Sequence, residues 1–191
     1  MRIFRLILTI VAILVIGGCS SKSNFYKLEA MNTKSGHKAT NTNKIIGIGT
    51  VKVADYLNQK PLIIKVSNTK LDIKETHRWA SNLSQNIQEV LRENISTLLP
   101  KYTVLSFPWE EPVDDRYRVF VSIDSMQRDT DNKAVLRGSW SLVNQESGKL
   151  IRHEEFSYSE VTDESYDSLV KTQSSMLTKL SRHIAKTISR L

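Results

Sequence analysis

The order of apolar and polar residues predicts a mixed α/β fold of the α+β type, in one compact domain over residues 25–191. Three alternating segments follow one another between residues 117 and 158, separated by turn-forming residues, which is typical of an antiparallel meander. Two long segments with apolar residues at three- and four-residue spacing lie before and after the meander, and they predict amphipathic helices. We therefore expect a mixed, largely antiparallel sheet with two long helices packed on it.

The two helices are placed by their apolar stripes. The first is expected to begin at Trp79, as a core anchor, and to stop before Pro100, because proline cannot continue a helix. The second is expected over residues 163–190, with Thr162 as its N-cap. The stripes comprise Trp79, Leu83, Ile87, Val90, Leu91, Ile95 and Leu98 in the first helix and Leu177, Leu180, Ile184, Ile188 and Leu191 in the second.

Short strands are expected in the first half of the chain. Residues 25–28 alternate like a brief strand, and residues 45–53 are β-rich. Within this second segment, Gly47 and Gly49 are followed by neither a Gly-Lys-Ser/Thr motif nor a helix, so they favour a close-packed strand or bulge over a phosphate loop.

A hairpin and the meander complete the predicted sheet. Residues 62–66 and 71–73 flank a Ser-Asn-Thr-Lys turn and predict the hairpin. Residues 102–106 form a further short strand. The residues expected to share a face in the meander are Tyr117, Val119, Val121 and Ile123 in its first strand, Leu136, Gly138, Trp140 and Leu142 in its second, and Phe156 and Tyr158 in its third.

The first 18 residues have the form of a secretory signal. Two arginines precede an apolar run of 11 residues, and such a run spans about 17 Å as a helix, too short to cross a bilayer comfortably. Gly17 and Gly18 then give a signal peptidase an unhindered backbone before Cys19, the only cysteine of the chain. The segment resembles the lipobox of bacterial lipoproteins, with Ile16 where leucine is usual. We expect cleavage before Cys19 and a short tether over residues 19–24.

The resemblance to the lipobox implies a lipid anchor on Cys19. A thiolate can be alkylated with a diacylglyceryl group, and an N-acyl chain would complete a strong anchor, since several chains hold far better than one. Ser20 follows in place of the aspartate that marks inner-membrane retention in enterobacterial-type sorting. By that resemblance, the expected destination is the periplasmic face of the outer membrane. The alternative is an uncleaved anchor helix that ends in a buried cysteine.

The charge distribution argues against nucleic acid as a partner. The signal segment carries Arg2 and Arg5 and no acid, so 25 basic residues remain against 20 acids. These basic residues are scattered rather than clustered into the stripe that nucleic-acid binding requires. The modest positive charge is ordinary solubilising charge, or it adds some attraction to anionic headgroups.

The sequence predicts no enzyme, cofactor or metal centre. Its four histidines are far apart and form no HExxH pair, and His153 and Glu154 would point to opposite faces of a strand. No nucleophile elbow is present. The acids of residues 110–115 could be an acid/base pair, but they are more simply a solvated loop beside Pro108 and Pro112. Trp109 in this loop is either exposed for a partner or for lipid headgroups, or a core residue.

Several short motifs, taken together and in order, resemble the PqiC-like family, the ABC-type transport auxiliary lipoproteins of MCE systems. They are Tyr26-Lys27-Leu28, residues 46–51 leading to Tyr56-Leu57, Arg78-Trp79-Ala80 with Leu83, Phe107-Pro108-Trp109 and Trp140-Ser141-Leu142. Two departures are Phe107, where the family often has tyrosine, and Gln59-Lys60, where an arginine is common. We expect Tyr56, Leu57, Arg78, Trp79, Leu83 and Trp140 to be structural.

The resemblance implies a non-enzymatic outer-membrane subunit of a trans-envelope lipid transport system. Its partners would be a periplasmic MCE-domain protein and, through it, an inner-membrane permease, and it would support membrane integrity. Because MCE proteins form rings, a ring-like homo-oligomer of this chain is a further expectation. Two other classes stay open: a monomeric lipid-binding shuttle, which needs an apolar cavity between sheet and helices, and an envelope hydrolase, which is disfavoured.

Overall fold

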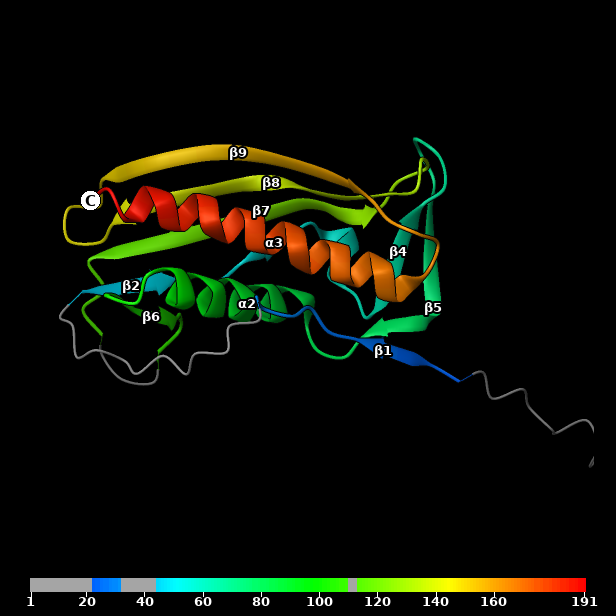
Figure 1. Ribbon diagram of the computed structural model, residues 1–191, viewed down its shortest axis with the longest axis horizontal. Coiled ribbons are helices and arrows are strands. Elements are labelled where there is room, and N and C mark those ends of the chain that lie inside the picture. Colours follow the sequence, from blue (N-terminus) through cyan, green and yellow to red (C-terminus); the bar gives the residue numbers. More distant parts are fainter. Residues whose placement is uncertain (1–21, 32–43, 110–112) are drawn as a thin grey trace, which may run out of the picture.

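The computed structural model of the protein describes residues 22–31, 44–109 and 113–191. The predicted signal segment, Gly17, Gly18, Cys19 and Ser20 lie outside the described residues. Within the described ranges, a nine-stranded sheet carries both long helices on one face (Figure 1). The mixed α/β fold expected from the sequence is confirmed.

The elements follow one another along the chain as short strands, a helix, longer strands and a second helix. In order they are β1 (Asn24–Tyr26), β2 (Ile45–Ile48), β3 (Lys52–Val53), the 3-10 turn η1 (Asp55–Leu57), β4 (Pro61–Lys65), β5 (Leu71–Trp79), α2 (Leu83–Leu98), β6 (Thr103–Ser106), β7 (Tyr117–Arg128), β8 (Lys133–Asn144), β9 (Leu150–Val161) and α3 (Tyr166–Ile188).

Strand β7 organises the sheet. Along one edge it pairs over its whole length with antiparallel β8, which pairs in turn with β9. Along its other edge three short parallel strands follow one another: β2 beside the start of β7, β3 beside its middle, and β4 at Arg128, its last residue. The 12 residues of β7 span about 36 Å, so they separate two ends of the molecule.

Different strands complete the sheet at these two ends. At the start of β7, β6 adds to the outer edge of β2. At the end of β7, β5 pairs with β4 in the predicted hairpin, and β1 lies beside β5. In Figure 1, β2 and β6 lie at one end of the long axis and β1, β4 and β5 at the other.

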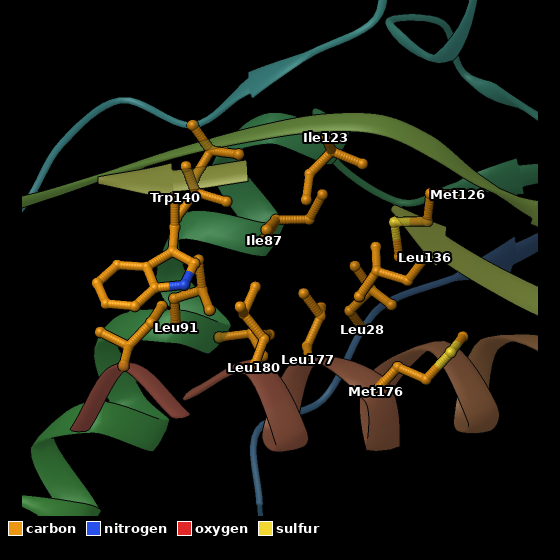
Figure 2. Packing of buried hydrophobic residues seen from close by; sticks show 14 of the residues in the cluster. Leu28, Ile87, Leu91, Ile123, Met126, Leu136, Trp140, Met176, Leu177 and Leu180 are labelled. Atoms are coloured by element: carbon orange, nitrogen blue, oxygen red, sulfur yellow. The ribbon is translucent and has the colours of Figure 1, made fainter. Parts of the chain in front are cut away.

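The core lies between the sheet and the two helices. Figure 2 shows Ile123, Leu136 and Trp140 from the long strands pointing towards side chains of α2 and α3. The predicted face of β8 is confirmed, since Leu136, Gly138, Trp140 and Leu142 are all buried. Among the described residues no helix combines the length and hydropathy needed to span a bilayer.

The first helix begins four residues later than predicted. Trp79 is core, as expected, but it is the last residue of β5, where its N–H donates to the Lys60 carbonyl at 2.7 Å. Asn82 is the N-cap, because its side chain accepts a hydrogen bond from the Gln85 N–H. The prediction was wrong because β5 continues through polar residues that hide its alternation, and a register shift of its pairing with β4 disturbs it further.

The second helix also begins later than predicted. Its N-cap is Ser165, which accepts from the Ser168 N–H, and not Thr162, whose hydroxyl donates to the Ser168 hydroxyl. Asp163 precedes the helix and accepts from the Ser165 N–H at 2.7 Å. The acid of the first helical turn is therefore Asp167, whose negative charge complements the positive N-terminal end of the helix dipole.

Candidate functional site

The segment that follows the expected tether is fastened between the two helices. Leu28 is fully buried, and the side-chain amide of Asn86 holds both its N–H (2.8 Å) and its carbonyl (3.3 Å). Asn94, two turns later on α2, accepts from the Met31 N–H at 2.7 Å. These contacts satisfy an extended backbone that would otherwise bury unpaired polar groups. We call residues 28–31 the strap.

Sequence reasoning missed the two asparagines that hold the strap. Both lie on the otherwise apolar face of α2, and Asn94 also donates to the Ser181 hydroxyl of α3 at 3.2 Å. Buried polar side chains are normally paired, so two asparagines eight residues apart within an apolar stripe indicate a backbone laid against the helix. That signal was present in the sequence.

An aromatic stack fixes the chain just before the strap. The Tyr26 hydroxyl and His77 Nδ1 lie 2.8 Å apart, and the His77 ring stacks on Tyr166 with 3.8 Å between centroids. Burial, followed by the charge of Asp167, raises the pKa of Tyr26. The tyrosine therefore stays a neutral phenol that joins β1, β5 and α3.

The remaining family-motif residues pack in the core or bind neighbouring residues of the chain. The Tyr56 hydroxyl donates to the Asp124 carbonyl (3.0 Å) and to Gln127 Oε1 (3.1 Å), which holds the irregular part of β7. Leu57, Leu83 and Trp140 are buried in the core. Arg78 is more exposed and binds the carbonyl and the carboxylate of Glu75.

At the opposite end, Phe107, Trp109, Arg118 and Asp115 form one cluster, which we call the aromatic–arginine cluster. The rings of Phe107 and Trp109 meet edge to face at 5.5 Å. The Arg118 guanidinium lies over both rings, 4.6 Å from the Phe107 centroid and 5.2 Å from that of Trp109. Pro108, between the two aromatic residues, is exposed, and Trp109 is half-buried.

A buried ion pair fixes the arginine of this cluster. Arg118 donates two hydrogen bonds of 2.7 Å to the carboxylate of Asp115, which is only 4% exposed. The hydrogen bonds to Asp115 raise the pKa of Arg118 against the opposing effect of burial, so the cation is kept. The expectation of a solvated acidic loop is therefore wrong for Asp115, though it holds for exposed Asp114. Glu110, Glu111 and Pro112 lie outside the described residues.

Distant segments hold this cluster in place. The side-chain amide of Gln88 on α2 donates to the carbonyls of Ile48, Gly49 and Phe107 at 2.7–3.1 Å. A Cβ on Gly47 would lie 2.3 Å from Asp115 Oδ2 and 2.9 Å from Trp109, so only glycine fits at that position. The prediction that Gly47 and Gly49 are close-packed is confirmed.

The described residues assemble no hydrolytic triad or metal centre at the histidines. His153 shares a hydrogen bond of 2.9 Å with the Ser141 hydroxyl on the open face of the sheet. Glu154 points to the helix side and contacts His183 Nε2 at 2.7 Å. The prediction that His153 and Glu154 face opposite ways is confirmed. Within the described ranges no group of three metal-ligating side chains occurs.

The comparisons with known proteins agree with the family expected from the sequence. Residues 26–185 match the model of the ABC-type transport auxiliary lipoprotein component. The chain is 29% identical over 187 residues to the intermembrane transport lipoprotein PqiC of Escherichia coli K12, covering 96% of this chain and 97% of that protein. The PqiC of Shigella flexneri matches equally.

Solved structures share the fold. A crystal structure of an uncharacterized protein superposes with a TM-score of 0.74 and 25% identity, covering 88% of this chain and 99% of the other. A Xanthomonas campestris protein superposes with a TM-score of 0.68 over 84% of this chain and 92% of the other; at 8% identity it shows the fold alone. By its family match over most of its length, this chain belongs to the ABC-type transport auxiliary lipoprotein components and is PqiC-like.

Proposed function

We propose that this lipoprotein is the outer-membrane docking subunit of an MCE-type trans-envelope lipid transport system. Its lipids would be a diacylglyceryl group and an N-acyl chain on Cys19, on the periplasmic face of the outer membrane. Its partner would be a periplasmic MCE-domain protein that leads to an inner-membrane permease, and the system would move phospholipid. The coarser role, an auxiliary lipoprotein of intermembrane transport, follows from family membership, and this family is not a known enzyme family.

One observation carries the proposal: β1, the strand into which the expected tether leads, and the aromatic–arginine cluster lie at opposite ends of β7. A docking subunit needs a firm hold on the membrane at one end and a rigid surface for its partner at the other. The strap supplies the first requirement, since the chain enters the core within ten residues of Cys19. The second is met by half-buried Trp109 and by Arg118, two residue types that are enriched among interface hot spots.

The lipid-binding shuttle receives less support. It requires an apolar cavity between sheet and helices. In the part of the chain that the structure describes, that space is filled by core side chains such as Leu28, Trp140 and Leu180 (Figure 2).

The decisive experiment is a crosslinking pull-down from envelopes with the tagged lipoprotein. We expect an MCE-domain protein to be captured by the natural sequence and to be lost with Trp109→Ala. Phe120→Ala is the matched control, because Phe120 is an exposed aromatic on the open sheet face and its removal should leave capture intact. Capture that survives Trp109→Ala would remove the cluster from the interface, and no capture at all would overturn the docking role.

Two further measurements test the anchor and the assembly state. Cys19→Ser should abolish acylation, seen as the absence of the lipid mass and as transfer of the protein from the membrane to the soluble fraction. Native mass spectrometry should find a homo-oligomer that matches the ring of the partner. Observation of monomer alone, with and without the partner, would contradict the ring.

A further inference from the structure

Exposed apolar side chains gather at the end of the molecule that contains β1 and the β4–β5 hairpin. Val66, Leu71 and Ile73 of the β4–β5 hairpin are each 40–46% exposed, Phe25 in β1 is 64% exposed, and Val161 at the end of β9 is 79% exposed. Pairing places all of them beside the last part of β7: Ile64 pairs with Arg128, β1 pairs with β5, and Val161 pairs with Lys133. Isolated exposed apolar residues are normal, but a group at one end indicates a contact surface.

The hairpin presents apolar groups from both of its faces. Leu71 and Ile73 pair with Lys65 and Ile63 and lie on one face, while Val66, one residue further along the strand than Lys65, lies on the other. On each face these apolar side chains lie beside charged ones, Lys65 on the first and Asp72 and Lys74 on the second, so both faces of the hairpin are amphipathic. An amphipathic boundary, with hydrocarbon below and polar headgroups above, accommodates such a tip.

The length of the tether brings this end to the bilayer. Asn24 is five residues after Cys19, so even a fully extended chain between them spans only about 18 Å. Asn24 and Phe25 pair with His77 and Arg78, and Ile73 lies four residues back along β5, about 13 Å away. A lipid on Cys19 therefore confines the hairpin to the neighbourhood of the headgroups.

Charge at the hairpin permits this contact. Residues 60–78 carry Lys60, Lys65, Lys70, Lys74 and Arg78 against Asp72 and Glu75, a formal charge of +3. The acids that precede and begin α3, Asp163, Glu164 and Asp167, lie at the same end and offset part of this charge. Burial of the apolar side chains would therefore contribute more than electrostatic attraction to holding the hairpin on the membrane.

We propose that the β4–β5 hairpin, with Leu71 and Ile73 at its centre, is a membrane-contact element that inserts into the headgroup layer of the leaflet holding the Cys19 lipid. The inference rests on the lipid anchor of the proposed function. The membrane contact would orient the long axis of β7 away from the membrane plane and direct the aromatic–arginine cluster into the periplasm. The occupant of the surface is the phospholipid bilayer itself.

The test uses the acylated mature protein, in which the lipid blocks the thiol of Cys19, the only natural cysteine. A thiol-reactive, environment-sensitive fluorophore is attached to Leu71→Cys or Ile73→Cys, or to Leu150→Cys as the matched control. Leu150 is a comparably exposed leucine at the start of β9, at the opposite end of the molecule. The proteins are placed in phosphatidylethanolamine–phosphatidylglycerol vesicles with and without lipids that carry a doxyl quencher.

We expect a blue shift and doxyl quenching of the labels at positions 71 and 73, and neither effect at position 150. Hairpin labels that stay in water, or equal quenching at all three positions, would overturn the orientation. A blue shift that resists doxyl lipid and persists in detergent would mean that protein, either a second copy or the partner, covers the hairpin, and it would overturn the membrane contact. Quenching together with a failed pull-down would leave the contact standing and remove only the docking role.

Discussion

The two ends of β7 handle their polar groups in opposite ways. Along α2, Asn86 and Asn94 point inward and bind the backbone of the strap, and the apolar side chains at the tether end remain exposed. At the far end, Arg118 of the charged pair Asp115–Arg118 lies over two aromatic rings, and a proline and part of a tryptophan face solvent. The first arrangement fixes the N-terminal chain to the core, while the second pre-organises a partly exposed surface.

In the proposed docking role, this difference would let the protein connect a membrane to a partner without a moving part. The strap fastens the N-terminal chain to both helices, so a pull on a lipid at Cys19 would act on the core rather than on a loop. The aromatic–arginine cluster is pre-organised by Gln88 and Gly47 from other elements. This lowers the conformational entropy that the cluster would lose on binding a partner. Each end can be disrupted separately, because the strap and the aromatic–arginine cluster share no residue.

The largest contrast is between two tryptophans. Trp79→Ala removes a side chain that is 6% exposed and should lower the free energy of unfolding by about 4 kcal/mol, because large core truncations leave a cavity. Trp109→Ala should lower it by about 1 kcal/mol while weakening partner binding about 30-fold, the effect of a hot spot of about 2 kcal/mol. Urea denaturation and a binding titration measure the two quantities. Equal stability losses would make Trp109 a core residue and remove the contrast.

The fate of these tryptophans illustrates what the sequence could and could not predict. The core role of Trp79 followed from its place at the start of an apolar stripe. Its position in a strand was not predictable from local sequence, because β1, which pairs with this part of β5, lies more than 50 residues away in the chain. The turn at Ser67–Lys70 and the meander were predictable because their pairing is local. The burial of Asp115 was not, since it depends on Gly47, which is nearly 70 residues distant in the chain.

The strap can be tested by a pair of substitutions within four residues. Leu28→Ala should cost about 3 kcal/mol, because Leu28 is fully buried between the helices and the sheet. Phe25→Ala should change the free energy of unfolding by no more than about 0.5 kcal/mol, since that ring is mostly exposed. Chemical denaturation of the soluble domain gives both values. A small effect of Leu28→Ala would mean that the strap is not part of the folded core.

The aromatic–arginine cluster can be disrupted by substituting the glycine that packs against it. Gly47→Ala forces a methyl group against Asp115 and Trp109 and should cost about 2 kcal/mol, with loss of partner capture. Gly49→Ala is the control: its methyl group meets the Phe120 ring at 2.8 Å, which is exposed enough to turn away, and the Val119 carbonyl at 3.1 Å, so it strains the strand without touching Asp115 or Trp109. Capture should therefore survive Gly49→Ala. Capture that also survives Gly47→Ala would show that partner binding does not depend on the cluster.

The smallest effect is a pH dependence at the tether end. Asp129 accepts from the Thr130 N–H at 2.8 Å and lies 3.2 Å from Lys65 of the hairpin. The hydrogen bond from Thr130, followed by the contacts with Lys65, lowers the pKa of Asp129 below its usual 3.8. The carboxylate therefore stabilises the fold above about pH 4, and this contribution is lost as the pH falls through the lowered pKa of the folded state.

Asp129→Asn should remove this part of the acid dependence and about 0.5 kcal/mol at neutral pH, the usual size for a surface pair. Asp131→Asn, in the same turn, removes the same charge together with the exposed ion pair to Lys133, but leaves Lys65 and the Thr130 N–H untouched. Urea titrations between pH 3 and pH 7 should give a flatter curve for the first variant than for the second. Two equally flattened curves would trace the effect to overall charge. A difference would show that the contacts of Asp129 with Lys65 and with the Thr130 N–H, and not the charge alone, stabilise the fold.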